Sequence, residues 1–278
     1  LDVQAAIPIV MGSNVGTTVT NTLVAAGHIN RPEEFRRAFS AATLDDVFNV
    51  LAIIILFPLQ LYTNFLGLGA SMLAQGFVSI GGLKLINPLK LAVDPFVGLV
   101  IQMSSGAGML VLVIALVLLF FSLRQMVDNL RFLMIGRIEK LFDETIFKNA
   151  LTAMLLGVTL TVLVQSSSIT TSLIVPLAGA GFLSLAQVSP YVLGANVGTT
   201  VTAILAALVT GEEVAVTVAF AHLLFNVTGI ALIWPVRRLP IALSSLLAEY
   251  TLRSRLVPIL YILVTFFLIP LALIYLVR

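Results

Sequence analysis

The stretch Gln165-Ser166-Ser167-Ser168-Ile169-Thr170-Thr171-Ser172 places seven uncharged polar side chains inside an apolar segment. The apolar run 150–164 precedes it, and the apolar residues 173–177 follow it. An unpaired polar group costs several kcal/mol in a hydrocarbon environment. The cluster must therefore face protein, water or a ligand, and we expect it to face a cation and an anion.

Composition places this segment in a membrane protein. The chain has 278 residues, of which 59% are apolar and 10% charged, with a mean hydropathy of +1.11. A soluble domain usually carries about 25% charged residues. The absence of cysteine excludes disulfides and thiolate metal sites, and a net charge of +2 gives no reason to expect nucleic acid. Because Leu1 is not Met and no signal peptide precedes it, we expect an N-terminally truncated chain.

Two segments combine apolar character with helix-breaking residues. In residues 5–26, Pro8, Gly12 and Gly16 favour a broken helix or a re-entrant hairpin over a clean span. Residues 190–208 form a second interrupted segment of the same kind. We expect a tip at 179–181, where two glycines flank an alanine.

The rest of the chain divides into apolar spans and polar connections. The expected spans are residues 47–65, 109–121, 214–234 and 257–277. The expected connections are the polar loop 27–37, the glycine-rich loop 67–105, an amphipathic surface helix over 124–148 and the arginine-bearing loop 237–255.

An internal repeat relates the two interrupted segments. Residues 8–20 (PIVMGSNVGTTVT) match residues 190–202 (PYVLGANVGTTVT) with a constant offset of 182. Phe48-Asn49 likewise matches Phe225-Asn226 at an offset of 177. The same offset places a first copy of Gln-Ser-Ser-Ser about seventeen residues before Leu1.

The basic residues favour an inverted repeat. If the repeat is inverted, one side of the membrane carries residues 27–37, 124–148 and 237–255, which hold most of the fifteen Lys and Arg. Because loops rich in Lys and Arg face the cytoplasm, that side is expected to be cytoplasmic. Inverted repeats with broken helices at the midplane are typical of secondary transporters. The prediction is an all-α polytopic membrane protein with two inverted-topology repeats, broken helices and re-entrant hairpins. Its parts are the first repeat (1–66), an extracellular loop with a connecting helix and cytoplasmic amphipathic helix (67–146), the second repeat (147–236), and a cytoplasmic loop with a C-terminal span (237–278).

The polar groups suggest which ligands bind. Neutral side-chain oxygens and unwound carbonyls replace the hydration shell of a monovalent cation without a buried charge. Backbone N–H groups at the start of a helix, together with hydroxyls, suit an oxyanion such as phosphate. Because no fixed cation is present, co-bound sodium would offset the charge of the anion and couple the two.

Several motifs together resemble the type II sodium–phosphate cotransporters. They are Gln165-Ser166-Ser167-Ser168, the paired Gly-[Ser/Ala]-Asn-Val-Gly-Thr-Thr, residues 34–39 (EFRRAF) and residues 234–241, which begin Trp-Pro and end Arg-Leu-Pro-Ile. The resemblance implies sodium-driven phosphate uptake at the plasma membrane, with Na+ as the co-transported ion, no organic cofactor and both Gln-Ser-Ser-Ser copies in the shared site. It also places Asp46 where electrogenic members carry an aspartate associated with a further sodium ion.

The chain departs from the family pattern in several places. By comparison with the family we expect a first Gln-Ser-Ser-Ser before Leu1 and a final helix beyond Arg278, neither of which lies within residues 1–278. The stretch around 102–106 is short where animal members have a long disulfide-bonded loop, which indicates a bacterial protein of the inner membrane. Asp45 stands where the family has a histidine.

From these arguments we assign candidate ligand residues. For phosphate they are Gln165, Ser166, Ser167, Asn14, Thr17, Asn196 and Thr199. For sodium they are Gln165, Ser166, Ser168, Thr171, Thr18, Thr200 and Asp46.

Each of these residues also has a plain structural interpretation. The hydroxyls could bond back to their own helix, and the glycine motifs could serve helix packing. Asp45 and Asp46 could be solvated at the membrane interface, His222 could be a satisfied core residue, and Asn49 and Asn226 could bond to unwound backbone.

Two other functions are compatible with the sequence. An anion channel would need a continuous polar path, whereas the cluster is compact. A non-transporting receptor or scaffold could use the same fold. No nucleotide-binding loop or metal-ligand cluster is present in the sequence, which disfavours a pump or an enzyme.

Overall fold

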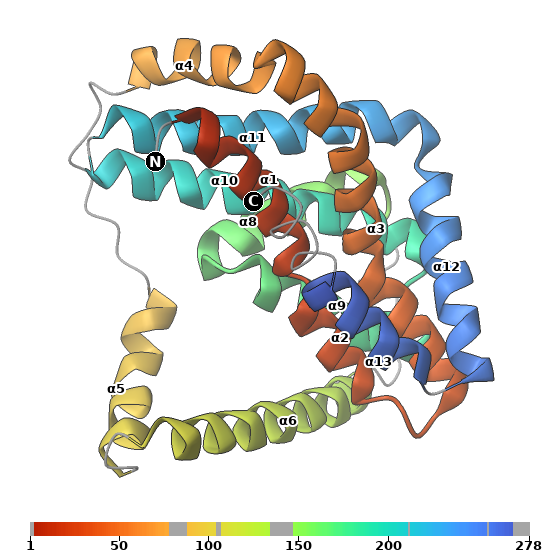
Figure 1. Cartoon of the computed structure of the whole chain (residues 1–278). Helices are drawn as coiled ribbons and strands as arrows, with labels where there is room; N and C mark the ends of the chain where they lie inside the picture. The colour runs from red at the N-terminus through yellow and green to blue at the C-terminus, as the bar shows by residue number, and fades with distance from the viewer. Residues whose placement is uncertain are drawn as a thin grey trace.

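The computed structural model describes residues 3–77, 88–103, 107–133, 147–210, 212–254 and 256–268, and within these ranges it is helical without strands (Figure 1). The N-terminal helices are α1 (Val3–Gly16), α2 (Val19–Ala26), α3 (Pro32–Thr63) and α4 (Phe65–Phe77). The middle helices are α5 (Pro88–Met103), α6 (Gly108–Leu133), α8 (Ala150–Val164) and α9 (Ser167–Ala180). The C-terminal elements are α10 (Leu185–Thr210), α11 (Glu213–Ile233), the 3-10 turn η3 (Trp234–Val236), α12 (Arg238–Arg253), α13 (Leu256–Leu263) and the π-helical turn η4 (Val264–Leu268).

Three of the described helices are long and apolar enough to cross a membrane. They are α3, α10 and α11, the last extended by η3. In contrast, α1, α8 and α9 have 14, 15 and 14 residues, fewer than the roughly 20 that a full span requires. The all-α membrane architecture is therefore confirmed, and it combines full-length spans with short helices that end inside the structure.

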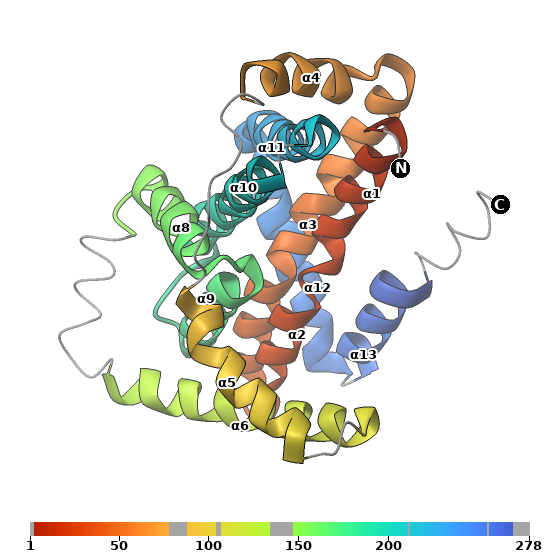
Figure 2. The ribbon, with the colours of Figure 1, turned by 90° about the vertical axis from the view of Figure 1, so that its left-hand side faces the viewer.

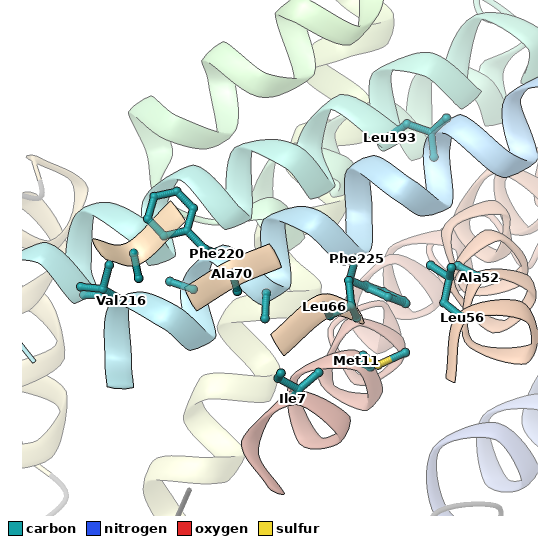
Figure 3. Close-up of a cluster of buried hydrophobic side chains, with 14 of the residues drawn as sticks. Ile7, Met11, Ala52, Leu56, Leu66, Ala70, Leu193, Val216, Phe220 and Phe225 are labelled. Carbon is teal, nitrogen blue, oxygen red and sulfur yellow. The ribbon is translucent and has the colours of Figure 1, made fainter. Parts of the chain in front are cut away.

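The main apolar core joins five of these helices. Helices α10 and α11 lie side by side, and α4 covers α11 (Figures 1 and 2). Phe225 of α11 is fully buried among Ile7 and Met11 of α1, Leu56 of α3 and Leu66 of α4 (Figure 3). Burying a large apolar side chain contributes about 1.5–3 kcal/mol in soluble proteins, but in lipid the gain comes mainly from close packing. This core holds α1 against α3, α4 and α11.

Helices α8 and α10 pack backbone to backbone through glycine. A Cβ added at Gly157 would lie 2.1 Å from the Tyr191 carbonyl oxygen, and one at Gly194 would lie 2.0 Å from the Met154 carbonyl oxygen. At Gly198 a Cβ would lie 2.6 Å from Thr161 Cβ. Small residues let membrane helices approach closely in this way. The glycines of the second motif copy are therefore packing residues.

The prediction that residues 190–208 are interrupted is wrong, because α10 is continuous from Leu185 to Thr210. Pro190 lies inside the helix, where its missing N–H removes one intrahelical hydrogen bond without ending the helix, and the glycines face α8. The first copy does break: α1 ends at Gly16 and α2 begins at Val19, as expected. Two nearly identical sequences thus adopt different local structures.

Several expected loops are helical. The glycine-rich stretch contains α4 and α5, and the arginine-bearing stretch forms α12, which packs along α3 through Pro240, Ser244, Ala248 and Thr251. Helix α3 already begins at Pro32, inside the expected polar loop. Helix α6 continues from the apolar run to Leu133 without the expected boundary, and residues 134–146 of the expected surface helix lie outside the described residues.

The expected tip after α9 is present. Gly181 has a φ of 88°, and its N–H caps the helix by bonding to the carbonyls of Ala178 and Leu177. Arg37 Nε donates to the Gly179 carbonyl oxygen at 2.9 Å. Arg37 thereby ties the start of α3 to the end of α9.

Candidate ion-binding site

Two helix breaks of the described chain meet. One break separates α1 from α2 at Thr17 and Thr18, and the other separates α8 from α9 at Gln165 and Ser166. Ser168 Oγ, in the first turn of α9, donates to the Thr17 carbonyl oxygen at 3.0 Å. The polar stretch of α9 is therefore placed directly against the first copy of the repeated motif.

Gln165 forms the turn at the second break. Its backbone is left-handed (φ 55°, ψ 30°), a conformation that costs a non-glycine residue roughly 1–2 kcal/mol, and its N–H bonds to the Thr161 carbonyl at 2.7 Å. Ser166 then caps α9 by accepting from the Ile169 N–H at 3.3 Å. The first-turn N–H groups of Ser167 and Ser168 have no acceptor in their own helix and are available to a ligand.

Helices α2 and α9 run side by side in the same direction. Ser168 lies level with Thr17, just before α2, and one turn later Thr171 Oγ1 donates to Asn21 Oδ1 at 3.0 Å. Both helix N-termini therefore lie at the same level. Each carries roughly half a positive charge from its aligned peptide dipoles, so two of them together favour an anion.

Many hydroxyls bond back to their own segment, as the plain interpretation expects. Thr17 Oγ1 donates to the Asn14 carbonyl at 3.0 Å and Thr18 Oγ1 to the Val15 carbonyl at 2.7 Å. Thr199 and Thr200 do the same within α10, to the carbonyls of Ala195 and Val197. Within the described residues, no hydrogen bond connects Thr199 or Thr200 to the other candidate residues.

Asp46 is buried rather than solvated at an interface. Its side chain is 2% exposed and accepts hydrogen bonds from Thr18 Oγ1 and from the Tyr261 hydroxyl of α13. Asp45, its neighbour on α3, is 4% exposed. No basic residue in the described ranges forms an ion pair with either carboxylate.

Asn14 is held by the second repeat. Its Oδ1 lies 2.8 Å from His222 Nε2, and its Nδ2 donates to Asn226 Oδ1 at 3.4 Å. Asn49 Nδ2 donates to the Asn14 carbonyl at 3.4 Å. Asn49 thus bonds to backbone beside the break, as expected, whereas Asn226 bonds to a side chain.

Asn196 is held by the first repeat in the same manner. Its Nδ2 donates to Asp45 Oδ1 at 2.7 Å, and Asn49 Nδ2 donates to the same oxygen at 3.0 Å. Asn196 is the repeat equivalent of Asn14, and the offset of 177 that relates Asn49 to Asn226 also relates Asp45 to His222. Each repeat therefore supplies an asparagine to the other repeat.

The structure sorts the candidate residues into three groups. Thr17, Ser166, Ser167 and Ser168 lie at the meeting point of the breaks with Gln165 and Thr171, and Thr18 and Asp46 bond to each other beside it. Asn14 and Asn196 belong to the buried amide network, and Thr199 and Thr200 bond only within α10.

Sequence reasoning missed two partners of these groups. Asn21 bonds to Thr171, and its spacing of one helical turn from Thr17 and Thr18 would have indicated it. Tyr261, the partner of Asp46, has no sequence signal, because it comes from a helix more than two hundred residues away.

Fold and site together define an all-α membrane protein whose interrupted helices bring hydroxyls, amides and buried carboxylates to one place. Residues 118–274 match the family model described as Na+/Pi-cotransporter. The chain belongs to this family.

Curated relatives support the same assignment over nearly the whole chain. Sodium-dependent phosphate transport protein 2A of Ovis aries is 32% identical over 349 residues, which covers 97% of this chain and 55% of that protein. Protein 2B of Bos taurus is 30% identical, covering 98% of this chain and 53% of that protein, and human 2B is 28% identical with the same coverage. The chain spans about half the length of the curated relatives it matches. No solved structure matches it significantly.

Proposed function

We propose that the protein is a secondary transporter that couples inward sodium movement to uptake of inorganic phosphate. The observation that carries the proposal is the meeting of two helix breaks, with the N-termini of α2 and α9 side by side at Thr17 and Ser168. Secondary transporters place substrate and coupling ions at such interruptions near the membrane midplane.

Phosphate suits the positive ends of these two helices. The free N–H groups of Ser167 and Ser168 and the side-chain amide of Gln165 supply donors for its oxygens. Within the described ranges, the ion-paired arginines gather at the start of α3 and not at the breaks. The site therefore carries only partial positive charge, which is insufficient by itself for a multiply charged anion.

Sodium would supply the missing positive charge. Asp46 and the Thr18 hydroxyl provide oxygen ligands, and the last carbonyls of α1 and α8 point toward the same breaks. The loaded site is closer to neutral than a site that holds the anion alone. Because the anion-only site could not close at low cost, phosphate transport becomes coupled to sodium binding.

We further propose that the two repeats are inverted and that the transporter lies in a bacterial inner membrane with its basic loops in the cytoplasm. The exchange of Asn14 and Asn196 between repeats supports a two-fold relation. Gly12 and Gly16 of α1 have no atom within 4 Å of a Cβ position, whereas their equivalents Gly194 and Gly198 pack on α8. An α8-type helix carrying the first Gln-Ser-Ser-Ser would fill that face of α1 and complete the site.

Uptake of radiolabelled phosphate into proteoliposomes containing the full-length protein tests the function. We expect saturable uptake with an inward sodium gradient and background uptake when potassium replaces sodium. Phosphate flux that does not depend on sodium would indicate an anion channel. Ligand-dependent stability without flux would indicate a receptor on the same fold. Competition by arsenate and sulfate would then define anion selectivity.

Asp46→Asn should change sodium coupling more than phosphate recognition. The variant keeps the hydrogen bond from Tyr261 or Thr18 but removes the negative charge that holds a cation. We expect the apparent sodium affinity to fall about tenfold or more, which corresponds to about 1.4 kcal/mol, and the charge moved per phosphate to change. Electrophysiological recording of phosphate-induced currents measures both quantities. Tyr261→Phe, which keeps the carboxylate, should have a smaller effect, and unchanged charge movement in Asp46→Asn would remove Asp46 from the sodium site.

A further inference from the structure

Asp45 is a second buried carboxylate of α3, and the transport cycle proposed above gives it no role. The surroundings of the two carboxylates differ: Asp46 contacts Thr18 and Tyr261, whereas Asp45 contacts Asn49 and Asn196. Both hydrogen bonds to Asp45 end on Oδ1, at 3.0 and 2.7 Å. Within the described residues, its Oδ2 accepts no hydrogen bond.

Asn49 supplies a second unpartnered oxygen beside this carboxylate. The residue is fully buried, and its Nδ2 donates both to Asp45 Oδ1 and to the Asn14 carbonyl. These two acceptors fix the orientation of the amide. Asn49 Oδ1 then has no hydrogen-bond partner in the described part of the chain. A buried acceptor left without a partner is destabilising, so a donor or a cation is expected there.

The protein itself offers no positive charge to this pair. The ion pairs of the described residues lie at the start of α3, and the imidazole of His222 is directed at Asn14 Oδ1. A buried carboxylate with no compensating cation is costly. Oxygen ligands with one negative charge among them suit a hard monovalent cation.

We propose that Asp45 and Asn49 form a sodium site in addition to the site at Asp46. Asp45 Oδ2 and Asn49 Oδ1 are its side-chain ligands, and Asn196 positions the carboxylate through Oδ1. The role of this ion in transport rests on the function proposed above, whereas its binding does not.

The second repeat provides an internal comparison. Its equivalent of the Asp45–Asn49 pair is His222 with Asn226, and Asn14 there takes the place of Asn196. The amides are the same in both repeats, but only the first repeat carries a carboxylate. The additional cation therefore belongs to the first repeat alone, and Asp45→His gives this position the residue of the second repeat.

Asp45→Asn tests the transport role with little risk to folding. The new amide keeps Oδ1 as an acceptor for Asn49 and Asn196. In proteoliposomes with the full-length protein, we expect the ratio of radiolabelled sodium to phosphate flux to fall by one sodium per phosphate while uptake continues. Asp45→His should show the same loss, and Glu249→Gln, which neutralises an exposed carboxylate on α12, should not. An unchanged ratio in Asp45→Asn would overturn the transport role.

Sodium binding without phosphate gives a separate measurement. Sodium chloride, compared with potassium chloride, should raise the thermal unfolding temperature of the purified full-length protein, and Asp45→Asn should lose part of that sodium-specific rise. If wild-type protein transports no phosphate yet shows this difference, the proposed function fails and the Asp45 site stands. If the variant keeps the full sodium response and loses only a pH dependence, Asp45 carries a proton and the sodium site is wrong.

Discussion

Gly194→Ala is expected to unfold the second repeat or force α8 away from α10. The added Cβ would lie 2.0 Å from the Met154 carbonyl oxygen, and backbone cannot move aside as a flexible side chain can. Overpacking usually costs about 1–3 kcal/mol and occasionally more, and we expect at least the upper part of that range here. Thermal unfolding in detergent, followed by fluorescence-detected gel filtration, measures the loss.

Gly76→Ala is the matched control, because a Cβ at this exposed position of α4 meets no atom within 4 Å. It should leave stability unchanged or raise it slightly, since alanine favours a helix over glycine by up to about 1 kcal/mol. Gly12→Ala adds a second comparison. It should be harmless if the face of α1 is free, and as damaging as Gly194→Ala if an α8-type helix covers that face in the full-length protein. Equal behaviour of Gly194→Ala and Gly76→Ala would contradict close packing of α8 on α10.

The sequence predicted the membrane class and that the polar stretch would not face lipid, because both depend on local composition. The stretch from Gln165 to Ser172 cannot face lipid, and the structure places its first turn against Thr17. The break between α1 and α2 and the turn at Gln165 could also be predicted from the sequence, since glycine and polar residues interrupt otherwise apolar runs.

What the sequence could not predict depends on tertiary partners. The motif Gly-[Ser/Ala]-Asn-Val-Gly-Thr-Thr breaks at Thr17 and stays helical at Thr199, because the second copy packs on α8 and the described part of the first does not. Local sequence is nearly identical in the two copies. Packing therefore decides between a break and a helix, and no single-segment pattern contains that information.

The arginines of residues 237–255 also led to a wrong prediction for α12. Its arginines suggested a loop, yet Pro240, Ser244, Ala248 and Thr251 recur at helical spacing and are all buried against α3. Small residues at this spacing are typical of a close helix contact, and they were a usable signal. The burial of Asp45 and Asp46, in contrast, could not be predicted, because their partners Asn196 and Tyr261 come from distant helices.

Gln165→Gly should separate a ligand role for Gln165 from a structural one. Glycine adopts the left-handed backbone of this turn without the cost that glutamine incurs, so the variant should be as stable as wild type or more stable by about 1 kcal/mol. If the amide binds ions, the same variant should weaken apparent sodium and phosphate affinities together by about tenfold or more, the effect of losing roughly 1.4 kcal/mol of interaction. Initial uptake rates over a range of both ions measure these affinities.

Gln165→Asn is the control, because asparagine keeps an amide and tolerates left-handed backbone better than other non-glycine residues. Its amide is one methylene shorter, so it should recover part of the affinity that glycine loses. A Gln165→Gly protein with raised stability and unchanged uptake would contradict the ligand role. Gln165 would then serve only to form the turn between α8 and α9. A joint loss of both affinities at preserved stability would instead place Gln165 among the ligands of the coupled ions, because coupling passes the loss of a contact with either ion on to the affinity for the other.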